Sequence, residues 1–320
     1  MTAISIIKLF FVVALLLSYF GVDLIRRFAE RRKIMDIPNE RSSHSRPTPR
    51  GGGLAIVAVV LGGTISAILC QELFSDFSMS PVPWIAFLVG GALVAGISFL
   101  DDLYSLSNKI RFACHILAAA VVLVFCGHWE TVGLPFFGNI PLGWIGYPIT
   151  FFWIISLINV YNFMDGIDGI AGIQALTAGG AWFAVGMLEG MNDVALCGAL
   201  IAGSSIGFLF HNWHPARIFM GDVGSAFLGF VFAFLAVFAA VRHPVCAVVG
   251  ILVVWPFVFD GTFTILCRLR RGENIFHAHR SHIYQRLVSL GWSHTQVSLL
   301  YGILGGLGSL ICVLYFYHIN

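Results

Sequence analysis

Aspartate side chains recur at the ends of the long apolar segments of this 320-residue chain. The positions concerned are Asp101, Asp102, Asp165, Asp168 and Asp222. A charged group at the edge of a hydrocarbon layer is costly to keep, so function is the first explanation to consider. Clustered carboxylates beside basic loops are typical of sites that hold a divalent metal and a phosphorylated substrate.

The composition places these carboxylates in a membrane-embedded fold. Hydrophobic residues make up 58% of the chain and charged residues 11%, whereas a soluble domain carries about 25% charge. We therefore expect an all-α, polytopic integral membrane protein with residues 1–320 in a single transmembrane domain. The seven cysteines are scattered without a C-x-x-C pair, which favours free buried thiols over a disulfide framework or a zinc site.

About ten segments are long and apolar enough to cross a bilayer, which takes roughly 20 residues. The candidate spans are residues 4–25, 52–72, 82–100, 112–128, 143–161, 171–188, 193–210, 225–241, 245–266 and 297–317. The longest loop on the outer side, about 128–142, contains several Gly and Pro residues and is expected to hold a small hairpin.

The basic residues predict how these spans are oriented. Sixteen of the 18 Lys and Arg residues fall on one face of the threaded chain, and Lys8 and Arg242 remain for the other. The positive-inside rule makes the basic face cytoplasmic and puts both termini outside, in the periplasm. All five aspartates then lie at the cytoplasmic face, where we expect the active site.

The first polar segment, 36–53, cannot form a helix because of its Pro and Gly residues. His44, Arg50 and the backbone N–H groups around them could bind a diphosphate or a lipid phosphate. A basic anchor for anionic lipid explains the same composition equally well.

The second segment begins with Asp101 and Asp102 directly after an apolar run and ends near Lys109. Neighbouring residues on a helix point about 100° apart. One carboxylate can therefore face a cleft while the other binds a helix end or a basic residue. Lys109 is a candidate for binding an anionic substrate. The alternative is a solvated helix terminus.

The third segment, 159–172, carries four polar side chains three residues apart, a spacing that places them along one side of a helix. They are Asn159, Asn162, Asp165 and Asp168. Gly166 and Gly169 would let a ligand or another backbone approach closely. A polar stripe that holds helices together is the alternative, although two Asp and two Asn exceed what packing needs.

The fourth segment, 219–225, is a Gly-rich turn that opens the eighth span. Backbone N–H groups at a helix start favour phosphate, and Asp222 in this turn could carry Mg²⁺. Taken alone, the segment is better explained by an ordinary helix N-cap.

The fifth segment, 270–286, combines His and Arg residues that could bind phosphate and sugar hydroxyls. Its candidates are His279, Arg280, His282 and Arg286. The spacing of these histidines matches no common zinc pattern, and no cysteine is close enough to complete one.

Taken in order, these segments resemble the polyprenyl-phosphate N-acetylhexosamine-1-phosphate transferase family. The resemblance runs from Asp36 to Trp292 and depends on the Asp101-Asp102 pair, the Asp-Gly-Ile-Asp-Gly core of 159–172, and Gly-Asp-Val-Gly-Ser at 221–225. It implies a multi-pass enzyme of the bacterial inner membrane. Such an enzyme transfers an N-acetyl-aminosugar-1-phosphate from a UDP-sugar to undecaprenyl phosphate and releases UMP. Its partners are these two substrates and membrane lipid, without nucleic acid, and a homodimer is one option for its assembly.

The resemblance also implies roles for individual residues. Asp222 would be the ligand of Mg²⁺, for which Mn²⁺ could substitute. Asp101 and Asp102 would orient or deprotonate the lipid phosphate. The nucleotide and diphosphate would meet Asn162, Asp165 and Asp168. His282 matches the first His of a His-x-His element.

The sequence departs from that pattern at Tyr284, which stands where the second His is expected. The triple-His stretch expected of the muramoyl-pentapeptide member is absent, which argues against that member. The stretches 39–44 and 279–286 look more like those of the branch that starts O-antigen synthesis. Direct transfer and a route through an aspartyl intermediate, for instance on Asp101, both remain open, and we expect the loop 270–292 to select the sugar. A secondary transporter of a small anionic or sugar-nucleotide substrate, or a lipid-binding scaffold, fits the carboxylates less well because they gather at the cytoplasmic ends.

Overall fold

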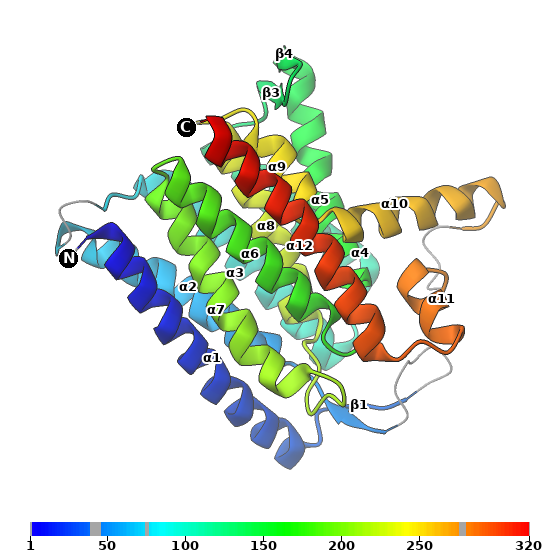
Figure 1. Cartoon of the computed structure of the whole chain (residues 1–320). Helices are drawn as coiled ribbons and strands as arrows, with labels where there is room; N and C mark the ends of the chain where they lie inside the picture. The colour runs from blue at the N-terminus through cyan, green and yellow to red at the C-terminus, as the bar shows by residue number, and fades with distance from the viewer. Residues whose placement is uncertain (1, 39–45, 74–76, 275–279, 320) are drawn as a thin grey trace.

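The computed structural model describes residues 2–38, 46–73, 77–274 and 280–319 and is almost entirely helical (Figure 1). The helices are α1 (Ala3–Arg32), α2 (Gly53–Cys70), α3 (Pro81–Tyr104), α4 (Asn108–Cys126), α5 (Gly146–Phe163), α6 (Ile170–Leu188), α7 (Asn192–Asn212), α8 (Asp222–Ala240), α9 (Cys246–Leu252), α10 (Trp255–Arg270), α11 (Ile283–Ser289) and α12 (His294–Ile319). The strands are β1 (Met35–Asp36), β2 (Thr48–Pro49), β3 (Thr131–Leu134) and β4 (Gly138–Pro141). Short 3-10 turns occupy Gln71–Leu73 and Gly143–Ile145.

Within the described residues, nine helices are long and apolar enough to cross a membrane, and the bent pair α9 and α10 brings the number to ten. The polytopic all-α fold expected from the sequence is therefore confirmed. The span expected at 245–266 is not one continuous helix but the bent pair, because α9 and α10 meet at an angle of 72°. Pro256 lies in the first turn of α10, and a proline cannot continue a helix because it lacks an N–H donor. Figure 1 shows α10 leaving the bundle to the side.

Helix α8 forms the centre of the bundle. All its residues from Val223 to Ala240 are buried, and α2, α3, α5 and α9 pack around it. Phe230, Phe234 and Phe238 form a stacked column along one side. Since the packing is close along its whole length, the N-terminus of α8 is a fixed point for the residues that gather there.

The loops at that N-terminus are joined by backbone hydrogen bonds. The N–H of Phe219 donates to the carbonyl of Pro49 (2.8 Å), and the N–H of Gly52 donates to the carbonyl of Phe219 (2.9 Å). Gly53 and Gly224 face each other so closely that a Cβ on Gly53 would meet the backbone of Gly224. This crossing holds the end of the 36–53 segment against the Gly-rich turn of the 219–225 segment.

The two short sheets mark opposite ends of the bundle. Strands β1 and β2 pair antiparallel, with Met35 opposite Pro49. The hairpin of β3 and β4 pairs Thr131 with Pro141 and confirms the hairpin expected in the loop 128–142. In Figure 1 both termini lie at the same end as this hairpin, whereas β1 and α11 lie at the other end.

A partly buried ion pair lies at the hairpin end of α8. Arg242 donates to both carboxylate oxygens of Asp193 (2.7 and 2.6 Å), and Asp193 is 3% exposed. The indole N–H of Trp84 also donates to Asp193, over 3.2 Å. Arg242, one of the two basic residues predicted for the outer face, is therefore held by a carboxylate in the helix bundle.

Candidate active site

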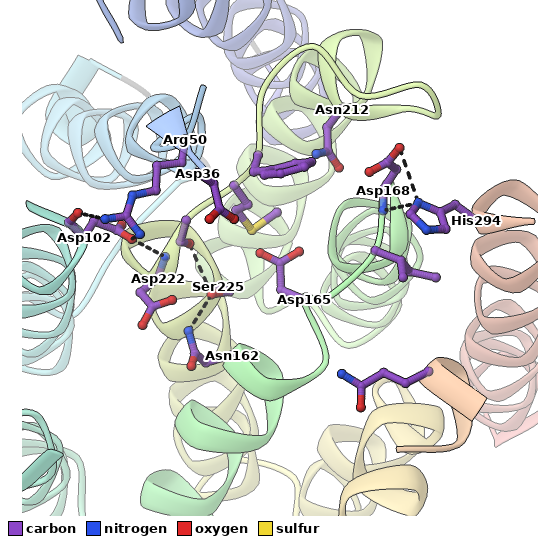
Figure 2. A pocket seen from close by; sticks show the side chains of 16 residues that line it. Asp36, Arg50, Asp102, Asn162, Asp165, Asp168, Asn212, Asp222, Ser225 and His294 are labelled. Carbon is purple, nitrogen blue, oxygen red and sulfur yellow. Dashed lines mark hydrogen bonds and ion pairs between the residues drawn. The ribbon is translucent and has the colours of Figure 1, made fainter. Parts of the chain in front are cut away.

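A cavity of about 270 Å³ lies at the N-terminus of α8 and is walled by the helix ends and loops around it (Figure 2). Five carboxylates line it: Asp36, Asp102, Asp165, Asp168 and Asp222. Among the described lining residues, Arg50 is the one Lys or Arg side chain. The cavity is therefore rich in carboxylate oxygens, which are the ligands that hard cations prefer.

Asp102 joins the cavity wall to the start of α8. Its carboxylate accepts hydrogen bonds from the backbone N–H groups of Asp222 (3.2 Å) and Val223 (3.1 Å). It therefore satisfies N–H groups that a helix leaves without an intrahelical partner. Arg50 forms an ion pair with the Asp102 carboxylate at 3.8 Å and donates to the Asp102 carbonyl. This is the helix-end contact expected for one member of the aspartate pair.

Asp222 is the first residue of α8, not its cap, because Gly221 occupies the N-cap position. The Asp222 side chain is 36% exposed. Nη1 of Arg111 lies 3.0 Å from its carboxylate and 2.6 Å from the carboxylate of Asp101. Asp101 also accepts from the backbone N–H of Leu106 (2.7 Å), so it is bound at the end of α3 and does not line the cavity.

The helical stripe expected at 159–172 is wrong. Helix α5 ends at Phe163, and Asp165 and Asp168 lie in the turn before α6. Asn162 lines the cavity and donates to the hydroxyl of Ser225 (2.9 Å). Asn159 instead donates to the carbonyl of Ile155 and does not line the cavity. The two glycines of the segment favour a turn over a continued helix.

Asp165 points into the middle of the cavity in Figure 2. Its carboxylate makes no side-chain hydrogen bond or ion pair within the described residues. Burial raises its pKa well above the usual value, and the charges of Asp222, Asp102 and Asp168 raise it further. A cation or a hydrogen-bond donor of a substrate near Asp165 would lower the free-energy cost of ionising this carboxyl group.

Asp168 lies at the opposite wall with two histidines. Nδ1 of His214 is 2.6 Å from its carboxylate, and Nδ1 of His294 is 3.4 Å away. The N–H of Ala216 also donates to it. Burial by itself would raise the pKa of Asp168, but the hydrogen bonds from His294, His214 and Ala216 outweigh burial and hold the pKa below its usual value. Asp168 is therefore the stably ionised member of the turn.

Two guanidinium groups beside the cavity retain unused donors. The Nε atoms of Arg50 and Arg111 are buried without a hydrogen-bond partner in the described chain. A buried donor without a partner costs free energy, and an anion can satisfy it. The site thus combines carboxylates that suit a hard divalent cation with guanidinium groups that suit phosphate oxygens.

Several predicted site residues lie outside the cavity lining. Lys109, Arg280 and Arg286 are exposed and do not line the cavity. His282 is buried and places its Nδ1 3.1 Å from Asp260. His44 and His279 lie outside the described residues.

Sequence reasoning also missed residues that the fold brings to the site, namely Asp36, Arg111, His214, Gln285 and His294. Arg111 follows the Asp101-Asp102 pair in the same loop, so its opposite charge was an available signal. His294 is separated from Asp168 by more than a hundred residues, and no local pattern links the two.

Sequence comparisons identify the relatives of this chain. The model of glycosyl transferase family 4 matches residues 84–240. A probable undecaprenyl-phosphate N-acetylglucosaminyl 1-phosphate transferase of Bacillus subtilis is 32% identical over 308 residues, covering 95% of this chain and 83% of the relative. The decaprenyl-phosphate N-acetylglucosaminephosphotransferase of Mycobacterium leprae is 33% identical over 320 aligned positions, which cover 90% of this chain and 78% of that protein. The phospho-N-acetylmuramoyl-pentapeptide-transferase of Bacillus licheniformis is 27% identical over 302 residues, with 90% and 89% covered.

These relatives align over nearly the whole length of the chain, and the matched residues 84–240 contain Asp101, Asp102, Asp165, Asp168 and Asp222. The family resemblance drawn from the motifs is confirmed: the chain belongs to glycosyl transferase family 4.

Proposed function

We propose that the protein transfers an N-acetyl-aminosugar-1-phosphate from a UDP-sugar to undecaprenyl phosphate. The observation that carries this proposal is the cavity with five carboxylates at one end of a transmembrane bundle. The names of the relatives, which describe transfer of amino-sugar phosphates to polyprenyl phosphates, support it. A lipid acceptor explains why the cavity lies at one end of a transmembrane bundle. A nucleotide donor, which is water-soluble, explains why the cavity is open to solvent.

The charge of the cavity supports a requirement for a divalent metal. Both substrates are anions, and ionised carboxylates in the cavity, such as that of Asp168, would repel them unless cations intervene. Carboxylate, amide and hydroxyl oxygens from Asp222, Asn162 and Ser225 meet at this wall, and oxygen ligands are those that Mg²⁺ prefers. We therefore propose that Asp222 holds Mg²⁺, with Mn²⁺ as a substitute. When bound, the metal would neutralise charge on the diphosphate.

In the proposed reaction, an oxygen of undecaprenyl phosphate attacks the β-phosphorus of the UDP-sugar. The bond between that phosphorus and the bridging oxygen breaks, and UMP leaves with the electron pair. The second pKa of a phosphate monoester is about 6, so the attacking oxygen is largely ionised at neutral pH. Positioning then matters more than proton removal, and the guanidinium group of Arg50, which lines the cavity, suits phosphate oxygens.

A route through an aspartyl intermediate on Asp101 is disfavoured by the position of that side chain. A nucleophilic aspartate must reach the β-phosphorus, but the Asp101 carboxylate is bound by Arg111 and by the N–H of Leu106 outside the cavity lining. We place the enzyme in the bacterial inner membrane with its cavity facing the cytoplasm. The product would be the first lipid-linked intermediate of a cell-envelope polysaccharide such as O-antigen.

The decisive experiment is an assay of UMP release by purified protein. The assay contains undecaprenyl phosphate, Mg²⁺ and a panel of UDP-N-acetyl-aminosugars. We expect release to require both lipid and metal and to fall to background in Asp222→Asn. The matched control is Asp193→Asn, which removes a buried carboxylate at the far end of α8.

The outcomes separate the alternatives. Loss of activity in Asp222→Asn but not in the folded fraction of Asp193→Asn would support the site. A wild-type protein that binds the lipid and releases no UMP from any donor would contradict the transferase. Binding of Mn²⁺, followed by electron paramagnetic resonance, should weaken in Asp222→Asn; unchanged binding would contradict the proposed metal ligand.

A further inference from the structure

Asp260, on α10, is a buried carboxylate at the point where three segments meet. It is 0% exposed. It accepts hydrogen bonds from the backbone N–H groups of Ile283 (2.9 Å) and Tyr284 (3.1 Å), at the start of α11, and from the hydroxyl of Tyr301 (2.6 Å) on α12. His282 Nδ1 lies 3.1 Å away and the hydroxyl of Thr264 is at the same distance. Asp260 therefore binds α11 to both α10 and α12.

Helix α11 has only seven residues, too few to be stable alone. Its position depends on external contacts, and the negative charge of Asp260 at its N-terminus is the favourable sign for the helix dipole. A carboxylate that accepts from two successive backbone N–H groups also fixes the direction in which the helix starts. Losing Asp260 would leave those groups buried and free the helix to shift.

Helix α11 also contacts the turn between α5 and α6, which carries Asp165 and Asp168. Tyr284 is 1% exposed, and its hydroxyl donates to the carbonyl of Phe163 (3.1 Å), the last residue of α5. A Cβ on Gly166 would strike that hydroxyl. Tyr284, which stands where the family pattern has a histidine, thus packs directly on the turn that carries Asp165.

The next residue, Gln285, reaches the cavity itself. Of the described residues in the loop 270–292, Gln285 is the one that lines the cavity. Its Oε1 accepts from the backbone N–H of His282 (3.3 Å), which orients the amide. The Nε2 group is a neutral donor and suits a sugar hydroxyl or an N-acetyl carbonyl better than it would hold a phosphate, for which guanidinium groups are available nearby.

We propose that Asp260 is a positioning residue which, by fixing the start of α11, sets Gln285 against the sugar of the UDP-sugar donor. This proposal rests on the proposed transferase function and narrows sugar recognition from the loop 270–292 to one side chain. Within the described part of the chain, none of the residues that Asp260 hydrogen-bonds lines the cavity itself, and Gln285 is the lining residue on the helix whose start Asp260 fixes. We therefore expect its loss to affect the donor and to spare the lipid acceptor.

The test is a double-mutant cycle on the full-length protein, measuring KM for the UDP-sugar, KM for undecaprenyl phosphate and kcat. The variants are Asp260→Asn, Gln285→Ala and the two combined, with Asp193→Asn as the control for loss of a buried carboxylate. We expect each single variant to raise the donor KM about tenfold and to leave the acceptor KM within about twofold, because the lost contacts belong to the donor. The combined variant should be no worse than the stronger single one, since coupled residues do not add.

Multiplied effects in the combined variant, of about a hundredfold, would overturn the proposal because they would show that the residues act independently. An unchanged donor KM in Gln285→Ala would overturn it as well. A purely structural role for Asp260 would lower the yield of active protein and leave both KM values unchanged, as expected for Asp193→Asn.

If Asp260→Asn cannot be purified, Tyr301→Phe removes one of the hydrogen bonds to Asp260 and keeps the ring. The expected change in donor KM is then smaller but of the same kind, and no change would contradict the proposal. The wild type separates the two levels of inference. If the wild type turns over and the variants leave the donor KM unchanged, this proposal alone is wrong. If the wild type does not turn over at all, the proposed function is wrong.

Discussion

Arg111 and a divalent cation would compete for the Asp222 carboxylate. Nη1 of Arg111 lies 3.0 Å from the Asp222 carboxylate and 2.6 Å from that of Asp101, so a single guanidinium group at the N-terminal end of α4 neutralises two carboxylates. A divalent cation at Asp222 must share that carboxylate with Arg111 or displace it. Arg111 is therefore expected to set how tightly the site binds metal.

Replacing Arg111 with Gln should strengthen metal binding and weaken turnover. The substitution removes a positive charge 3.0 Å from the Asp222 carboxylate, so the affinity for Mn²⁺ should rise, by roughly 3- to 10-fold for one partly exposed charge. Titration of Mn²⁺ by electron paramagnetic resonance measures this. Arg111→Lys, which keeps the charge, is the matched control and should bind metal as the wild type does; weaker binding in Arg111→Gln would contradict the prediction.

Asp165 should make the protein less stable as the pH rises. Below about pH 4, the pKa of an ordinary Asp, both the folded and the unfolded states are protonated at this residue. Above that pH the unfolded chain releases the proton, whereas the raised pKa of Asp165 means that the folded state retains it, so the free energy of unfolding falls as pH rises.

Asp165→Asn carries no such charge. In EDTA it should be more stable than the wild type by a margin that is absent near pH 4 and grows up to pH 8, reaching a few degrees in Tm. Thermal unfolding in detergent across this range measures it, and Mg²⁺ should reduce the margin by stabilising the wild type. A margin that shrinks with rising pH would show that Asp165 is not held in a destabilising environment.

The residues of the site could be predicted only in part. The Asp101-Asp102 pair, the turn with Asp165 and Asp168, and Asp222 are recognisable because each motif is contiguous in sequence. Asp260 and His294 escape such reasoning because their partners come from distant helices. His282 is a different case, since its sequence marks it as a polar loop residue while the fold buries it against Asp260.

At the scale of elements, the sequence predicts helices well and their breaks poorly. Hydropathy locates each span because a helix must present about 20 apolar residues to lipid. The angle at α9 and α10 and the turn after Phe163 depend on local Pro and Gly and on tertiary contacts, which hydropathy does not report. The short α11 has no hydropathy signal at all, and its position follows from Asp260 and Tyr284.

The contact between α11 and the α5–α6 turn makes a prediction for Gly166. In Gly166→Ala the new Cβ would meet the hydroxyl of Tyr284 and push α11 away from the turn. We expect activity to fall at least about tenfold, with loss of stability of about 1–3 kcal/mol typical of overpacking. Kinetic and thermal measurements on the same preparation test both.

Tyr284→Phe removes the hydroxyl that the new Cβ meets. Combined with Gly166→Ala, it should recover part of the lost stability, although Tyr284→Phe alone loses the bond to Phe163. If the double variant is as unstable as the sum of the single ones, the clash is not the cause.

At the scale of the whole molecule, the bundle has two chemically different ends. Strand β1 and helix α11, which carry the cavity-lining residues Asp36 and Gln285, lie at one end, and both termini and the β3–β4 hairpin lie at the other (Figure 1). The positive-inside rule assigns the cavity end to the cytoplasm. The termini would then be periplasmic.

A reporter fused after Asn320 tests this assignment. Alkaline phosphatase, which is active only outside the cytoplasm, should be active there, and green fluorescent protein should be dark. The matched control is the same pair of reporters fused after Arg111, at the predicted cytoplasmic end. Fluorescence at the C-terminus would reverse the predicted orientation of the whole bundle.

The complete burial of α8 has a consequence for how the protein responds to bilayer thickness. Peripheral helices such as α1 and α4 expose much of their surface. They tilt when the hydrocarbon layer is thinner than they are long, and they draw the bilayer thinner around them when it is thicker. Helix α8 touches neighbouring helices along its whole length, so it has no lipid-facing surface through which mismatch can act. The Asp222 end of the cavity should therefore keep its geometry in membranes of different lipid chain length, and a change in lipid thickness should affect delivery of the acceptor before it affects the phosphate chemistry.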